Sequence, residues 1–176
     1  MKKSQSKIIV LSALCVALLV LCSWISLPAA VPFTMQTFAV AFIGAFLGAR
    51  RGSLAICVYI LLGFIGLPVF SGFGAGLPAI LGTTGGYTLG FLPFCIITGF
   101  LCRIFKKSYP ALFLSMSAGL LSCYIFGTLW YTYIYLSDLK SIYSAISLCV
   151  LPFIVPDLMK ISLAAFLVKK AEQFIK

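Results

Sequence analysis

The sequence has very little charge and no histidine. Only 9% of its 176 residues are charged, and just three of them are acidic. A soluble domain of ordinary composition has about 25% charged residues. Hydrophobic residues make up 62% of the chain, and the mean hydropathy is +1.18. This composition excludes an ordinary water-soluble domain and predicts a chain that is embedded in lipid.

The same scarcity excludes most catalytic and metal chemistry. An active site needs a nucleophile with a base, a pair of carboxylates or a metal centre, and no histidine is present to act as base or ligand. The seven cysteines are dispersed through apolar segments without a C-x-x-C pair, so neither a metal site nor a disulfide scaffold is predicted. The sequence also lacks a G-x-x-x-x-G-K-[ST] phosphate loop. We therefore expect no enzyme, no cofactor and no ATP-driven pump that works alone.

Long apolar runs take the place of charge. Uncharged runs cover residues 8–49, 52–102 and 108–137. Each run exceeds the length of about 20 residues that crosses a bilayer as a helix, and the first two are long enough for more than one crossing.

The basic residues mark the ends of these runs. Of the 13 Lys and Arg, 11 fall in four clusters, and the positive-inside rule places such clusters in the cytoplasm. If all four lie on one side, each interval between them crosses twice, which predicts an all-α bundle of six transmembrane helices with cytoplasmic N- and C-termini. The bundle is expected to form a single domain over residues 1–176. The net charge of +10 does not indicate nucleic acid, because the cations flank helix ends and form no stripe. The clusters are Lys2/Lys3/Lys7, Arg50/Arg51, Arg103/Lys106/Lys107 and Lys169/Lys170/Lys176.

One segment between the expected helices is unlike the others. Residues 68–87, PVFSGFGAGLPAILGTTGGY, contain many glycines, two prolines and no charge, and are not expected to form a regular span. Irregular backbone at membrane depth is tolerated where it is buried in protein or lines a cavity. We expect this loop to enter the outer mouth of the bundle and expose backbone groups to a ligand; a plain extracellular linker is the alternative. The expected helices cover about residues 8–27, 35–49, 53–67, 88–103, 111–136 and 142–170.

Two charges lie inside the last apolar segment. Asp157 and Lys160 are three residues apart, on one face of a helix. Ionisable groups inside a membrane cost about 2.5–3.5 kcal/mol each unless they face a partner or a polar cavity. Pro152 and Pro156 precede them and predict a kink beside the pair. The spacing leaves two interpretations open, an internal structural salt bridge or the polar floor of a site for a small solute with hydrogen-bonding and anionic groups.

Three stretches of the sequence resemble the BioY family, the biotin-specific substrate-binding (S) components of energy-coupling factor (ECF) transporters. They are VPFTMQT at 31–37, GLPVFSGFGAGLPAILGTTGGYTLGF at 66–91 and PDLMK at 156–160, and their order and spacing fit almost all of the chain. The family more often has proline at the position of Thr83, which is a departure of this sequence.

The resemblance implies a six-helix vitamin-uptake module of the bacterial plasma membrane that binds biotin from outside. Its implied partners are a membrane-embedded coupling protein, which packs against small residues of the first helix, and two ABC ATPases. Asp157 suits a ureido N–H of biotin, and Lys160 suits its carboxylate or ureido oxygen. Ala13 and Ala17 match the A-x-x-x-A pattern of the partner surface, and the other residues expected at biotin are Phe33, Thr34, Gln36, Ser71, Gly85, Gly86 and Tyr87.

Two alternatives to a biotin S component stay open at this stage. An S component for another small vitamin would have the same fold and a different pocket. A structural subunit of a membrane complex would use Asp157 and Lys160 as an internal clamp and bind no soluble ligand.

Overall fold

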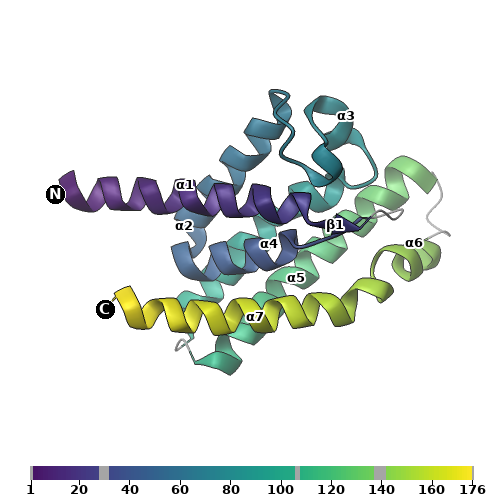
Figure 1. The fold of residues 1–176 in the computed structure, drawn as a ribbon. Helices are drawn as coiled ribbons and strands as arrows, with labels where there is room; N and C mark the ends of the chain where they lie inside the picture. Colours follow the sequence, from purple (N-terminus) through teal and green to yellow (C-terminus); the bar gives the residue numbers. More distant parts are fainter. Residues whose placement is uncertain (1, 28–31, 106–107, 137–141, 176) are drawn as a thin grey trace.

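The computed structural model describes residues 2–27, 32–105, 108–136 and 142–175, and these residues are almost entirely helical (Figure 1). Among them, five helices are long and apolar enough to cross a membrane, so the chain is a multi-pass membrane protein. The elements are α1 (Lys2–Trp24), β1 (Ser26–Leu27), β2 (Phe33–Thr34), α2 (Gln36–Phe64), η1 (Ser71–Phe73), α3 (Gly76–Leu81), α4 (Gly85–Ile104), α5 (Tyr109–Tyr131), the π-helical turn η2 (Thr132–Leu136), α6 (Ile142–Cys149) and α7 (Leu151–Ile175).

The long element α2 is a helical hairpin. Gly48 has φ 78° and ψ 170°, a conformation that is essentially limited to glycine, and it interrupts the helical path. The side-chain amide of Gln36 donates a hydrogen bond to the hydroxyl of Tyr59 at 2.7 Å, although a straight helix would hold these residues about 35 Å apart. The sequence predicted two short helices, over 35–49 and 53–67. The structure has two helical arms with the bend at Gly48, so Arg50 and Arg51 open the second arm instead of following the first.

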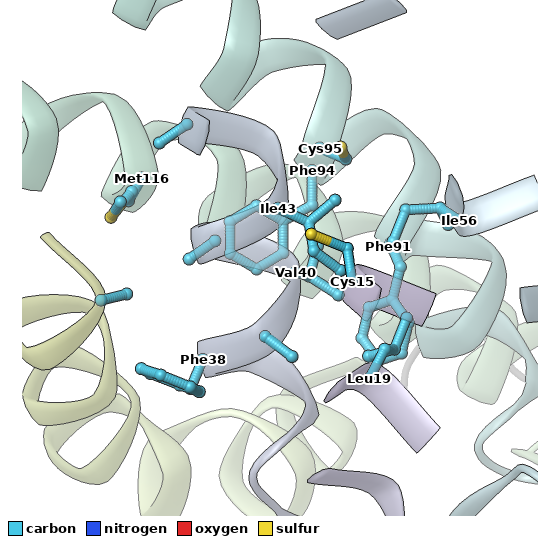
Figure 2. Close-up of a cluster of buried hydrophobic side chains, with 14 of the residues drawn as sticks. Cys15, Leu19, Phe38, Val40, Ile43, Ile56, Phe91, Phe94, Cys95 and Met116 are labelled. Carbon is cyan, nitrogen blue, oxygen red and sulfur yellow. The ribbon is translucent and has the colours of Figure 1, made fainter. Parts of the chain in front are cut away.

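The helices pack through small residues and a shared apolar core. α4 packs most extensively on α2 and α5. A Cβ on Gly99 of α4 would lie 2.2 Å from the backbone nitrogen of Ala49, so only glycine permits this approach. Figure 2 shows buried side chains of this core, which come from helices far apart in the sequence. They include Leu19 of α1, Val40 and Ile43 of α2, Phe91 and Phe94 of α4, and Met116 of α5.

The two ends of the bundle differ. Both termini lie at one end in Figure 1, and the bend of α2 and the end of α4 lie together, because Arg50, Arg51 and Arg103 line one groove. β1 and α6 lie at the opposite end. There β1 pairs antiparallel with β2, with Ser26 opposite Thr34, and fixes the start of α2.

The last apolar segment is divided where a single helix was expected. α6 ends at Cys149, and α7 begins at Leu151. Pro152 falls in the first turn of α7, where proline removes no helical hydrogen bond. The helix is interrupted at Val150, seven residues before Asp157. Pro156 lies inside α7, directly before Asp157, so the kink expected beside the charged pair stays a prediction.

Candidate functional site

Asp157 and Lys160 meet on the inner face of α7. Only 2% of Asp157 and 6% of Lys160 is exposed. The Lys160 Nζ lies 2.7 Å from Asp157 Oδ1, so the prediction that the two charges share one face of the helix is confirmed. Mutual neutralisation explains how two ionisable groups are accommodated in an apolar helix.

The Asp157 carboxylate is held from three helices. Its Oδ1 accepts hydrogen bonds from Lys160 Nζ at 2.7 Å and from Thr37 Oγ1 of α2 at 2.9 Å. Its Oδ2 accepts one from the hydroxyl of Tyr124 on α5 at 2.7 Å. A carboxylate can accept about four hydrogen bonds. These three bonds leave one acceptor position on Oδ2 for a ligand.

The Lys160 ammonium is also held by strand β2. Its Nζ donates to the backbone oxygen of Thr34 at 2.6 Å, and Nζ lies 3.8 Å from the centroid of the Phe33 ring. The Phe33 ring in turn stacks on Phe153 of α7, with centroids 6.2 Å apart. A cation over an aromatic face is stabilised by the ring quadrupole. Phe33, which was expected at biotin, therefore covers the Lys160 ammonium.

Beside this pair lies a cavity with a mainly apolar wall. It holds about 660 Å³ of empty space, including its open mouth. The aromatic residues of its wall come from the loop, α4, α5 and α7, and they are Phe70, Tyr87, Phe91, Tyr124 and Phe153. Its polar side chains, besides Asp157 and Lys160, include Thr34, Gln36, Thr37, Ser71, Thr84 and Thr88.

The loop over residues 68–87 contributes directly to this cavity, as predicted. It forms the short turns η1 and α3, and only its last three residues, from Gly85 on, belong to the spanning helix α4. The Oγ of Ser71 is buried and has no hydrogen-bond partner, although Ser71 lines the cavity. A buried hydroxyl without a partner is costly. Its position at the cavity wall makes it available to a ligand.

Gln36 lines the cavity, but its side chain is engaged within the protein. Its Oε1 accepts from Thr34 Oγ1 at 3.0 Å, and its Nε2 donates to the Tyr59 hydroxyl. That hydroxyl donates to the backbone oxygen of Val69 at 3.0 Å. The Gln36 amide and the Tyr59 hydroxyl thus link the two arms of α2 to Val69 at the start of the loop. This link helps to position Ser71, two residues further on, at the cavity.

Two of the expected ligand residues serve packing. Gly85 and Gly86 fall in the first turn of α4 and are absent from the described cavity wall. A Cβ on Gly85 would lie 1.6 Å from the backbone oxygen of Ile80, and one on Gly86 would lie 2.2 Å from Cβ of Trp130. Their lack of a side chain is explained by these close approaches. Tyr87, the next residue, does line the cavity.

Sequence reasoning missed Tyr124 and the role of Thr37. Both donate hydrogen bonds to Asp157. Thr37 belongs to the VPFTMQT stretch, so its motif pointed to the site. Tyr124 lies in the middle of the apolar helix α5. Its hydroxyl was the only feature of the sequence there that could have indicated a polar contact.

The predicted partner surface lies on the outside of the bundle. Ala13 and Ala17 are both exposed on α1. Ala13 also borders a groove between α1 and the second arm of α2, together with Leu54 and Val58.

Comparison with known proteins agrees with these features. The BioY family profile matches residues 1–176. The chain is 39% identical over 152 residues to "Biotin transporter BioY" of Thermotoga maritima, covering 86% of this chain and 87% of the relative. It is 37% identical to "Probable biotin transporter BioY" of Pyrococcus horikoshii, covering 81% of both. The fold resembles a crystal structure of the S-component for biotin from an ECF-type ABC transporter, with a TM-score of 0.88, 22% identity, and coverage of 98% of this chain and 94% of that one. The chain belongs to the BioY family, and the resemblance noted from its motifs is confirmed.

Proposed function

We propose that this member of the BioY family is the biotin-binding S component of an ECF transporter and captures biotin for uptake. The observation that carries the proposal is the cavity over the buried Asp157–Lys160 pair, because all three motif stretches contribute to its wall. The relatives named as biotin transporters and the solved biotin S-component support the choice of ligand. Biotin is here the transported solute, and the protein is not an enzyme.

The chemistry of the cavity suits biotin. The ureido ring of biotin has two N–H donors and one carbonyl acceptor, and its tail ends in a carboxylate. The free acceptor position on Asp157 Oδ2 suits a ureido N–H, and the Ser71 hydroxyl can donate or accept. Since Lys160 Nζ lies 2.7 Å from Asp157, both charges act on the same end of the ligand. The aromatic wall suits the thiophane ring and the aliphatic chain.

The proposed topology has six crossings, made by α1, the two arms of α2, α4, α5 and α7. Both termini then lie in the cytoplasm, and the membrane is the bacterial plasma membrane. Support comes from the termini and from Arg50, Arg51 and Arg103, which all lie at one end of the bundle.

The proposed partners are a membrane-embedded coupling protein and two ABC ATPases. The chain has no nucleotide-binding loop of its own. The exposed Ala13 and Ala17 form a small-residue face on which another helix can pack closely.

The test of the proposal is a thermal-shift assay of the purified protein in detergent without ATP. Biotin at about 100 times its Kd should stabilise the protein by roughly 2.7 kcal/mol, whereas thiamine, riboflavin and folate should not. Ser71→Ala should weaken biotin binding without lowering the stability of the unliganded protein, since its hydroxyl has no internal partner. Ser147→Ala, on the exposed face of α6, is the matched control. A shift with another vitamin and none with biotin would contradict the proposal.

A structural clamp is the second candidate, and one observation favours it. Most hydrogen-bonding positions of Asp157 and Lys160 are already used inside the protein. A pure clamp predicts no ligand, and it predicts that the exchanged pair Asp157→Lys/Lys160→Asp keeps stability and function. The S-component proposal predicts that the exchanged pair loses biotin binding.

A further inference from the structure

The end of the bundle that contains the termini has a groove that the biotin proposal does not use. It lies between the bend of α2 and the last turns of α4 and encloses about 1300 Å³, including its open side. Arg50 and Arg51 line it from α2, Arg103 lines it from α4, and all three are exposed. Three arginines from two helices therefore line one groove.

The chain offers little to neutralise these arginines. It contains only three acidic residues. One of them, Asp157, is paired with Lys160 and accepts a hydrogen bond from Thr37, near the start of α2. Thr37 precedes the bend at Gly48 by about 16 Å of helix, so Asp157 is remote from the groove. Among the side chains that the structure describes, no carboxylate lines the groove. The positive charge therefore favours an anion from outside the chain.

The walls of the groove indicate what kind of anion fits. Phe46, Leu54 and Phe100 stand beside the arginines, and Leu54 and Phe100 are 61% and 57% exposed. A ligand that contacts both the arginines and the apolar wall needs an anionic head and an apolar tail. Guanidinium groups bind phosphate through paired N–H donors. The second arm of α2 also begins at this groove, with the positive end of its dipole.

We propose that this groove binds the phosphate headgroup of an anionic phospholipid, with its acyl chains against Phe46, Leu54 and Phe100. A free phosphate would contact only the arginines. An acidic protein segment would pair with the arginines through its carboxylates, and those carboxylates would not cover the apolar wall. Basic pockets between membrane helices are suited to anionic lipid headgroups. The site is independent of the biotin cavity, which lies toward the opposite end of α2.

Native mass spectrometry of the delipidated full-length protein tests the proposal. The protein is offered equal amounts of dioleoyl phosphatidylglycerol and dioleoyl phosphatidylcholine. We expect the wild type to retain phosphatidylglycerol preferentially and Arg50→Gln/Arg103→Gln to lose roughly 30-fold in that preference, since each basic residue near anionic lipid contributes a factor of about five. The matched control Lys169→Gln/Lys170→Gln removes two exposed charges of α7 that lie outside the described groove wall and should keep the preference.

A charge-preserving variant keeps the test valid if the Gln variant does not fold. Arg50→Lys/Arg103→Lys keeps the charge but not the paired donors, and should still lose several-fold in preference. An excess of inorganic phosphate should not displace the lipid. The proposal is overturned by equal retention of both lipids, by an equal loss in the α7 control, or by displacement with phosphate. Biotin affinity should be unchanged in the groove variants, so failure here is separable from failure of the biotin proposal.

Discussion

The Asp157 carboxylate brings three helices to one point, because Lys160, Thr37 and Tyr124 all donate to it. A buried ion pair of this kind adds little net stability over an apolar pair of similar size, but removal of one partner leaves an isolated charge. The pair is therefore suited to defining a binding site, and less suited to strengthening the bundle.

This balance predicts unequal effects of single and double substitutions. Lys160→Met alone leaves Asp157 buried without its cation and should lower the free energy of unfolding by about 3–5 kcal/mol. Asp157→Asn together with Lys160→Met should cost clearly less than the two single changes added. Unfolding in mixed detergent micelles, followed by circular dichroism, measures these values. Additive losses would show that the two charges do not depend on each other.

Tyr124 should contribute to the site although no motif pointed to it. Tyr124→Phe removes the hydroxyl bonded to Asp157 Oδ2 at 2.7 Å. Hydrogen bonds to charged groups contribute about 1.5–3 kcal/mol, so biotin affinity should fall by roughly tenfold or more as the carboxylate loses its orientation. Isothermal titration calorimetry measures the change. Tyr133→Phe, at a side chain that is 79% exposed, is the control and should keep full affinity.

At the scale of elements, composition and charge placement predicted more than local pattern did. Apolar length and basic clusters located the long helices, and glycine and proline content identified the loop that lines the cavity. The sequence placed the bend of α2 at Arg50 and Arg51, between the helices expected over 35–49 and 53–67, whereas the structure has it at Gly48. The roles of Gly85 and Gly86 could not be read from the sequence, because a glycine at a ligand and a glycine at a tight helix contact look the same there.

The junction between the loop and α4 should tolerate no side chain at Gly85. Gly85→Ala would place Cβ 1.6 Å from the backbone oxygen of Ile80, so α3 or the start of α4 must move. We expect a lower melting temperature and at least tenfold weaker biotin binding, about 1.4 kcal/mol, since Thr84 and Tyr87 flank this residue in the cavity wall. Ile96→Ala, on the exposed face of α4, is the control. Unchanged biotin binding by Gly85→Ala would show that the geometry of this junction does not affect the binding site.

At the scale of the whole molecule, capture and delivery should be separable. The cavity proposed for biotin lies within the bundle, whereas Ala13 and Ala17 lie exposed on the outer face of α1. Asp157 and Lys160 were predicted to share one face of the last helix, but the hydrogen bonds that Asp157 accepts from α2 and α5 were not predicted. The contributions of α5 depend on the packing of helices far apart in sequence, which no local spacing encodes.

Enlarging the small-residue face should block delivery without affecting capture. Ala13→Leu/Ala17→Leu should bind biotin like the wild type, but uptake by cells containing the ECF partners should fall severalfold or more because a second helix can no longer approach closely. Binding to purified protein and uptake of labelled biotin measure the two steps. Leu14→Phe adds bulk at another exposed position of α1 and should leave uptake intact. Normal uptake by the double variant would place the partner surface elsewhere.

The contribution of the Asp157–Lys160 pair to biotin affinity is tested most directly by equilibrium dialysis of radiolabelled biotin against the purified protein in detergent. The wild type should bind without ATP, and Asp157→Asn/Lys160→Met should bind at least about tenfold more weakly, which corresponds to roughly 1.4 kcal/mol, while retaining its helical circular dichroism spectrum. Full-strength binding by the folded double variant, or no binding by the wild type, would contradict the account.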